Sequence, residues 1–316
     1  MDIGQFCREL SSDMPSFVRR IVFLQGAGGE VPVRVLQVPS DPSRPFPIVV
    51  VFHGARPEGA PYPMFYGHQF AGEETSDKLL IAIADPTLAA NPELRFGWYC
   101  GYRGIDAPAA IHTFLDALTS TLEPSRLILF GASIGAHPAL RFAKHFPGSV
   151  AVLVNPICQI SSYYDLAVRH YFETCWPGEF DDRSLQSEAV LDDAGSLFDD
   201  GPLQSTVAIL QNATDRHLIK QVAPLIARLG QFGQSAPKLL PIVSFFPGFI
   251  GHNMPHDEMG RCIEAAVRAA DTDALSIAMM REELSTVDKQ AERPLPVRDT
   301  SRDITLAREL AQQAAK

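Results

Sequence analysis

Apolar residues along this chain alternate between short continuous runs and longer segments of helical periodicity. A run of about four to eight apolar residues bounded by turn residues is typical of a buried strand, whereas apolar positions three and four apart indicate an amphipathic helix. The runs predict strands at 20–24, 31–38, 47–53, 79–84, 127–130, 150–154, 207–211 and 240–245. The periodic segments predict helices at 65–75, 107–122, 136–146, 217–229 and 258–281. This alternation favours right-handed crossovers and a mostly parallel sheet of about eight strands, with helices on both faces.

The turn between the first two predicted strands is rich in glycine, at Gly26-Ala27-Gly28-Gly29. Such a cluster also occurs in nucleotide-binding loops. It lacks the G-x-G-x-x-G spacing, however, and a strand rather than a helix follows it. We therefore expect an antiparallel hairpin at one edge of the sheet.

Residues 156–206 interrupt the alternation after the sixth strand. The first half of this segment is aromatic and the second half is acidic. We interpret it as a cap inserted over the carboxyl edge of the sheet. The alternative is a surface excursion whose aromatic rings pack it down and whose acids are solvated.

The end of the chain differs in composition from the rest. We expect one main domain over 1–282 and a C-terminal extension over 283–316. Pro294 and Pro296 interrupt the extension before a short amphipathic helix at 300–316, where Leu306, Leu310 and Ala314 form one apolar stripe. That stripe could dock on its own domain, form a homo-oligomer or remain loose.

Overall composition excludes several classes of function. The 316 residues are 46% hydrophobic and carry a net charge of −10, so there is no basic footprint for nucleic acid or an anionic membrane. The start of the chain has no apolar block of the secretory kind, and no apolar run is long enough to cross a bilayer, so we expect a soluble, cytoplasmic protein. The five cysteines are widely spaced and suggest neither a disulfide framework nor a zinc site.

One motif indicates a specific chemistry. The strand at 127–130 runs directly into Gly131-Ala132-Ser133-Ile134-Gly135, and a helix follows. In this strand-turn-helix context Ser133 occupies a strained turn that lifts its hydroxyl clear of the sheet, and the amide of Ile134 lies at a helix N-terminus where it can stabilise an oxyanion. The alternative is an ordinary turn of small residues with a capping serine.

A serine hydroxyl becomes a useful nucleophile when a base takes its proton and an acid holds that base. Asp215 follows the strand at 207–211 and His252 follows the strand at 240–245, so both lie where loops leave the same sheet edge. Asp215 could instead cap a helix. His256 is a rival base, and Asp165, after the sixth strand, is the alternative acid.

Two further sets of residues could be mistaken for functional sites. His252 and His256, beside Asp257 and Glu258, could be drawn as a metal site, but Pro255 between the histidines removes the regular helical face that such a site uses. We therefore expect no metal and no other cofactor. Two other histidines are expected to have structural roles: His137 packs on the helix behind Ser133, and His53 shapes the loop after the third strand.

These features resemble the α/β-hydrolase superfamily over roughly residues 18–282. The resemblance lies in the Gly131-x-Ser133-x-Gly135 turn, the His53-Gly54 pair after the third strand, and the chain order serine, acid, histidine. It implies a second oxyanion donor from the third-strand loop, which by position is the amide of Ala55. The tripled glycine of some esterases is absent here.

The resemblance implies a serine hydrolase that acts on a carboxylic ester or thioester through an acyl-enzyme. Trp98 and Tyr99, in the loop after the fourth strand, could line the pocket for this small acyl substrate, or could pack under the cap. An acyltransferase with an alcohol or amine acceptor would use the same three residues. A non-catalytic binding module of the same fold is the third alternative.

Overall fold

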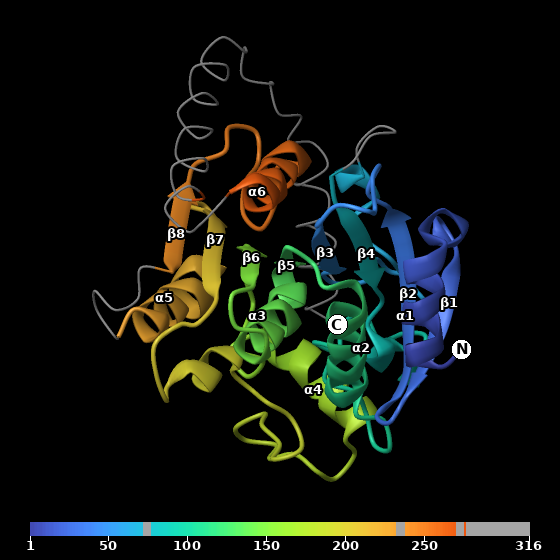
Figure 1. Cartoon of the computed structure of the whole chain (residues 1–316). Helices are drawn as coiled ribbons and strands as arrows, with labels where there is room; N and C mark the ends of the chain where they lie inside the picture. Colours follow the sequence, from blue (N-terminus) through green and yellow to red (C-terminus); the bar gives the residue numbers. More distant parts are fainter. Residues whose placement is uncertain (72–76, 232–237, 270–274, 276–316) are drawn as a thin grey trace.

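The computed structural model of the chain centres on one eight-stranded sheet (Figure 1). It describes residues 1–71, 77–231, 238–269 and Leu275, so the predicted amphipathic segment near the C-terminus lies outside the described residues. The strands are β1 (Ile21–Gly26), β2 (Gly29–Gln37), β3 (Pro47–Phe52), β4 (Leu79–Ile83), β5 (Arg126–Ala132), β6 (Val150–Val154), β7 (Thr206–Asn212) and β8 (Leu239–Ser244).

The strand order is β1-β2-β4-β3-β5-β6-β7-β8. β1 pairs with β2 and β2 with β4 in antiparallel fashion, and every later pair is parallel. Gly26 pairs with Gly29 across the first turn, so the expected edge hairpin is present. All eight predicted strands are confirmed, each with ends within two residues of the prediction.

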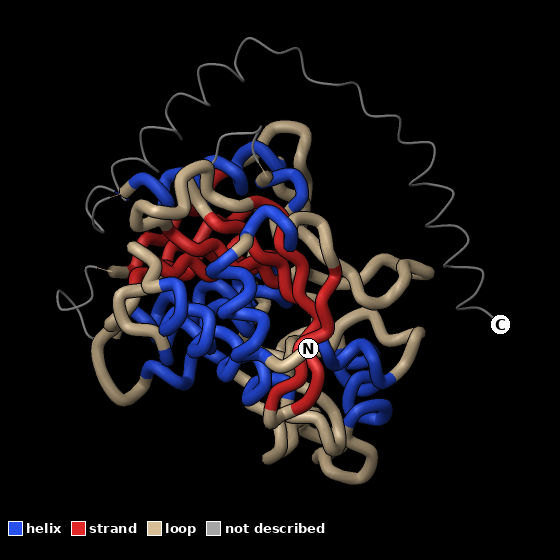
Figure 2. The backbone as a smooth tube through the Cα atoms, turned by 45° about the vertical axis from the view of Figure 1, so that its right-hand side comes forward, coloured by secondary structure: helices blue, strands red, loops and turns tan. Residues whose placement is uncertain are grey.

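Helices cover both faces of the sheet, as predicted (Figure 2). On one face, Ile48, Val50 and Phe52 of β3 share an apolar core with side chains of four helices. These helices are α1 (Ile3–Ser12), α2 (Ala107–Leu122), α3 (Ala136–His145) and α5 (Ala223–Leu229). On the other face, Val49 and Val51 pack in a core with α6 (His256–Arg268). Alternate residues of a strand point to opposite faces, which is why a continuous β-branched run can bury both.

Helix ends follow local chemistry. α2 begins and ends where predicted because the Asp106 side chain accepts a hydrogen bond from the Ala109 amide, and the chain leaves the helix at Glu123 with a left-handed φ of 45°. α1 was not predicted. Its N-cap is Asp2, whose side chain accepts a hydrogen bond from the Gln5 amide.

Three helix predictions need correction. The stretch at 65–75 contains only a 3-10 turn, η2 (His68–Phe70), because Gly67 adopts a φ of 111° that no right-handed helix allows; residues 72–76 are outside the described chain. The helix predicted from 217 begins as a π-turn, η6 (Leu218–Val222), since Pro224 in the first turn of α5 has no N–H to donate. α6 ends at Arg268, where Ala269 is extended, and apart from Leu275 the rest of the predicted stretch to 281 lies outside the described residues.

The segment between β6 and β7 contains α4 (Asp165–Cys175) and the 3-10 turn η5 (Ala194–Phe198). Its aromatic half forms a third apolar cluster, in which Tyr171 and Phe172 are buried together with Trp98 and Ile134. The inserted segment therefore packs beside the turn that carries Ser133. Its role as a cap stays a prediction.

Among the described residues, the longest helices are too short or too polar to cross a membrane.

Candidate active site

The turn after β5 holds Ser133 in a strained conformation. Ser133 has a φ of 56°, in the left-handed region that side chains rarely adopt, and opens the 3-10 turn η4 (Ser133–Gly135) that leads into α3. A Cβ on Gly131 would lie 2.0 Å from the carbonyl oxygen of Gly135, and one on Gly135 would lie 2.5 Å from that of Phe52 in β3. Both positions therefore require glycine.

Ser133, His252 and Asp215 form one hydrogen-bonded relay. Nε2 of His252 lies 2.8 Å from Oγ of Ser133, and Nδ1 of the same ring lies 2.6 Å from Oδ2 of Asp215. The His252 side chain is 36% exposed, whereas that of Asp215 is 1% exposed. A base that solvent and substrate can reach is thus held by a buried carboxylate. This arrangement can take a proton from the serine and stabilise the imidazolium that forms.

The electrostatics of Asp215 keep it ionised. Burial by itself would raise the pKa of its carboxyl group. Hydrogen bonds from His252 and from the backbone N–H of His217 outweigh burial and bring that pKa below its ordinary value. Asp215 therefore also makes the short-range bond expected of a capping aspartate, while its other oxygen faces His252.

Two asparagines, which sequence reasoning missed, hold the loop that carries His252. Nδ2 of Asn155 donates to the carbonyl oxygen of His252 at 3.1 Å, and Oδ1 of Asn155 accepts from the amide of Asn212 at 2.8 Å. Nδ2 of Asn212 donates to the carbonyl oxygens of Phe249 and Asn253, each at 2.9 Å. Both asparagines are buried. Their position at the carboxyl ends of β6 and β7 is the signal that could have identified them.

The loop after β3 approaches Ser133 closely. A Cβ on Gly54 would lie 3.4 Å from Cβ of Ser133, and Ala55 lines the same cavity as Ser133. Ile134 is buried in the first turn after the nucleophile. Both residues therefore lie next to Ser133, and the use of their amides as oxyanion donors is a prediction.

His53 shapes this loop as a neutral ring. Its Nε2 accepts from the amide of Asp85 at 3.0 Å, so Nδ1 carries the hydrogen and faces the carbonyl oxygen of Gly54 at 2.6 Å. Complete burial lowers the pKa of His53 to about 4, which agrees with this neutral state.

Trp98 and Tyr99 are not brought to the reacting serine. Both side chains are buried, and neither lines the cavity at Ser133. The Tyr99 hydroxyl accepts from the amide of His53 at 2.7 Å and donates to the carbonyl oxygen of Ile83 at 3.1 Å. Tyr99 thus supports the loop after β3, which fits the packing alternative that the sequence left open.

A cavity of about 560 Å³ opens beside Ser133 and His252. Its wall combines three methionines and a tyrosine with a few polar groups. The largest apolar side chains of the wall are those of Met64, Tyr66, Met254 and Met259. His256 also lines the cavity at the start of α6, but the ring bonded to Ser133 is that of His252.

The remaining candidates take no part in the relay. Asp165 is exposed at the start of α4, and the carboxylate beside His252 is that of Asp215. His137 is buried on α3, with Nε2 3.0 Å from the carbonyl oxygen of Leu191. Its packed position is the one expected from the sequence.

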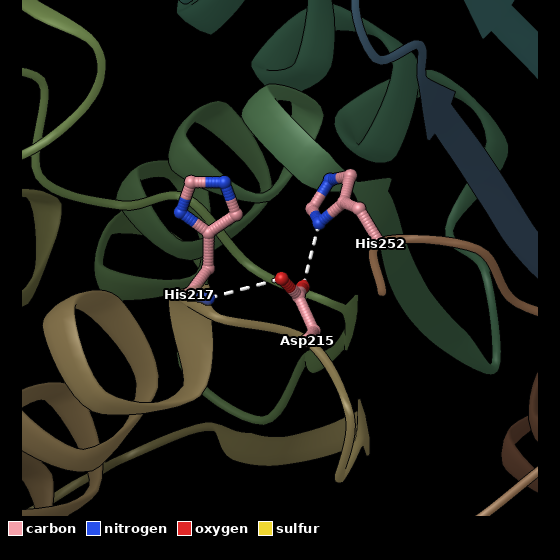
Figure 3. Close-up of side chains that lie close together, drawn as sticks. All are labelled: Asp215, His217 and His252. Atoms are coloured by element: carbon pink, nitrogen blue, oxygen red, sulfur yellow. Dashed lines mark hydrogen bonds and ion pairs between the residues drawn. The ribbon is translucent and has the colours of Figure 1, made fainter. Parts of the chain in front are cut away.

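A second histidine adjoins the relay (Figure 3). The ring of His217 lies 5.2 Å from that of His252, centroid to centroid, and stacks on Tyr163 at 5.6 Å. Its Nε2 is 3.2 Å from the hydroxyl of Tyr164. The inserted segment thus contacts the relay through His217.

Comparisons with known proteins find similarity in structure but not in sequence. No protein-family model matches the chain, and no curated protein matches it in sequence. Among solved structures, the capsule O-acetyltransferase of Neisseria meningitidis serogroup A is 15% identical with a TM-score of 0.53, over 84% of this chain and 94% of that one. An S-formylglutathione hydrolase from Agrobacterium tumefaciens is 17% identical with a TM-score of 0.51, over 78% of this chain and 98% of that one. The acylaminoacyl peptidase of Pyrococcus horikoshii is 13% identical with a TM-score of 0.53, over 84% of this chain and 40% of that one.

These three solved structures are α/β-hydrolases. The strand order, the glycine-flanked serine turn and these structural matches agree, and the chain has the α/β-hydrolase fold.

Proposed function

We propose that this protein is a serine hydrolase that cleaves carboxylic esters or thioesters through an acyl-enzyme on Ser133. The observation that carries the proposal is the continuous relay from Oγ of Ser133 through His252 to Asp215. A structural serine at a helix start needs neither a base within hydrogen-bond distance nor a buried carboxylate behind that base.

In the first step, Oγ of Ser133 attacks the carbonyl carbon while Nε2 of His252 accepts its proton. Asp215 accepts the Nδ1 hydrogen of His252, which keeps the Nε2 lone pair facing the serine. The amides of Ala55 and Ile134 donate to the oxyanion, and each such donor is worth about 3 kcal/mol. The protonated His252 then gives its proton to the leaving oxygen or sulfur. Water, activated by the same ring, releases the acid in the second step.

Acyl transfer is the second candidate function. The chemistry differs only in whether an alcohol or amine outcompetes water for the acyl-enzyme. The cavity beside Ser133, at about 560 Å³, has room for an acceptor next to a small acyl group. One of the structural neighbours is named as a capsule O-acetyltransferase.

Labelling with a fluorophosphonate probe tests the proposal. We expect the wild type to be labelled at Ser133 and the Ser133→Ala variant to lose both the label and turnover of p-nitrophenyl and thioester substrates by roughly a million-fold. Ser43→Ala, which removes an exposed hydroxyl of a remote loop, is the matched control and should react like the wild type. An unlabelled but folded wild type would contradict both enzyme proposals and favour the binding module. Product analysis with an alcohol or amine present separates hydrolysis from transfer.

A further inference from the structure

The side chain of His217 lies beside Asp215 and His252 of the relay, at a place that the proposed reaction does not require (Figure 3). Each residue offers one potential metal-ligand atom, and these atoms all lie within 4.8 Å of one another. Asp215 and His217 come from the turn after β7, and His252 comes from the loop after β8. Serine chemistry needs Asp215 and His252, but it gives no role to the ring of His217.

The spacing fits a small metal ion. Three atoms within 4.8 Å of one another always share a point about 2.8 Å or less from each, and zinc binds nitrogen and oxygen at about 2.0–2.2 Å. Shifts of less than about 1 Å would therefore close the site. Two imidazoles and one carboxylate are a common ligand set for zinc with an open fourth position.

The surroundings allow an ion to enter. The side chain of His252 is 36% exposed and adjoins solvent, whereas Asp215 and His217 are buried, so an ion would enter from the side of His252. Stacking on Tyr163 holds the ring of His217. Among the described residues, the bond from its Nε2 to the Tyr164 hydroxyl is the one that a metal ion at that nitrogen would replace. All five cysteines are buried, so they do not compete for added zinc in the folded protein.

We propose that Asp215, His217 and His252 form a reversible zinc site whose occupation switches off Ser133. In this state zinc binds Oδ2 of Asp215, Nε2 of His217 and Nδ1 of His252, and it replaces the hydrogen bond between Asp215 and His252. The proposal rests on the proposed serine chemistry for its effect on activity, but not for zinc binding itself.

The switch follows from the tautomer of His252. In the relay, Nδ1 carries the hydrogen and Nε2 offers a lone pair to Ser133. A neutral imidazole bound to zinc through Nδ1 carries its hydrogen on Nε2, so the proton moves through solvent from one nitrogen to the other and the ring keeps its charge. Nε2 then donates to Oγ of Ser133 and cannot accept its proton. In a serine protease, a wrong tautomer of this kind lowers turnover by about ten-thousand-fold.

The test measures zinc binding and serine reactivity separately on the full chain. Calorimetric titration with zinc chloride gives affinity and stoichiometry, and the rate of fluorophosphonate labelling with and without zinc gives the effect on Ser133. The variant His217→Phe removes one ligand and keeps an aromatic ring for the stack on Tyr163. His217→Gln, which keeps an acceptor for Tyr164, is the second variant. His145→Phe, which removes an exposed histidine at the end of α3, is the matched control.

We expect one zinc ion per wild-type chain and a slowing of labelling by about a hundredfold or more at saturation, reversed by EDTA. Both His217 variants should bind zinc at least about tenfold more weakly. Each variant should be labelled at the same rate with zinc as without it. His145→Phe should behave as the wild type, and magnesium, which prefers oxygen ligands, should have no effect.

Other outcomes separate the two proposals. The zinc site is overturned if the wild type binds no zinc, if the His217 variants bind it as tightly as the wild type, or if bound zinc leaves labelling unchanged. If zinc binds in a His217-dependent manner but Ser133 is unreactive even without it, the metal site stands and the proposed serine chemistry fails.

Discussion

Asn155 ties the ends of two strands to the base of the relay. Its Nδ2 donates to the carbonyl oxygen of His252, and its Oδ1 accepts from the amide of Asn212. Asn155 adopts a φ of 42°, a left-handed conformation that asparagine tolerates better than most residues. We infer that it is a positioning residue for His252, because the carbonyl it holds belongs to the same residue as the ring.

Replacing Asn155 with aspartate tests this role. The carboxylate keeps the acceptor for Asn212 but loses the donor, and it places negative charge against the carbonyl of His252. We expect kcat to fall by roughly ten- to a hundredfold, since small displacements of a catalytic group are costly. Turnover of p-nitrophenyl acetate measures the fall in kcat. Urea unfolding measures any accompanying fall in the free energy of unfolding.

Asn253→Asp is the matched control, because Nδ2 of Asn253 bonds within the same loop, to the carbonyl oxygen of Ile250. It should lower kcat by less than about threefold. Equal losses in the two variants would mean that Asn155 only stabilises the loop.

At the scale of elements, the buried ring of His137 joins α3 to the inserted segment. Its Nε2 donates to the carbonyl oxygen of Leu191, and among the described residues its Nδ1 has no hydrogen-bond partner. Burial lowers the pKa of His137 to about 3. A protonated ring would have to place a second N–H where no acceptor lies, which is the physical reason for the shift.

This low pKa predicts an acid-sensitive contact. Below about pH 6.5 the unfolded chain takes up a proton at His137 while the folded chain does not until about pH 3, so stability from this group falls as pH falls through that window. By pH 4 the loss is about 3 kcal/mol.

His137→Leu cannot titrate, and it should be less stable than the wild type at pH 7 because the carbonyl of Leu191 loses its donor. Its deficit should shrink by about 3 kcal/mol between pH 7 and pH 4 in urea unfolding. A deficit that is independent of pH would contradict this assignment.

Elements and their order could largely be predicted from the sequence, because a buried parallel strand is a continuous apolar run whatever surrounds it. Failures occurred where one residue overrode the pattern. Gly67 prevented a helix that periodicity favoured, and Pro224 gave another a π-turn at its start. Within the site, Ser133, Asp215 and His252 could be found because each follows a strand whose carboxyl end meets the same edge.

The supporting contacts could not be predicted in this way. The bonds of Asn155, Tyr99 and His217 join segments far apart in the chain, and those of Asn155 and Tyr99 go to backbone groups that carry no sequence signal. An asparagine that ends a strand reads from sequence alone as an ordinary turn residue.

At the scale of the whole molecule, the fold assembles the cavity from segments that lie about two hundred positions apart in the chain. The loop after β3 contributes Met64 and Tyr66, while the start of α6 contributes Met259. The Tyr66 hydroxyl approaches the Met259 sulfur at 3.8 Å, so the two segments meet across the cavity wall. Methionine side chains are flexible and apolar, and a wall built from them suits an aliphatic chain better than a rigid polar group.

We therefore expect Met259 to limit the length of acyl chain that Ser133 accepts. Met259→Trp adds bulk to the wall, and each methylene excluded from an apolar pocket costs about 1–3 kcal/mol of transition-state binding. The ratio of kcat/KM for p-nitrophenyl octanoate over p-nitrophenyl acetate should fall at least about tenfold relative to the wild type. Met259→Leu conserves volume and should leave that ratio within about threefold of the wild-type value. The ratio separates pocket length from any general loss of activity, because misfolding or a displaced relay lowers both rates together. If Met259→Trp keeps the wild-type ratio, the acyl chain lies elsewhere, and the methionine wall contacts the leaving group or the acceptor instead.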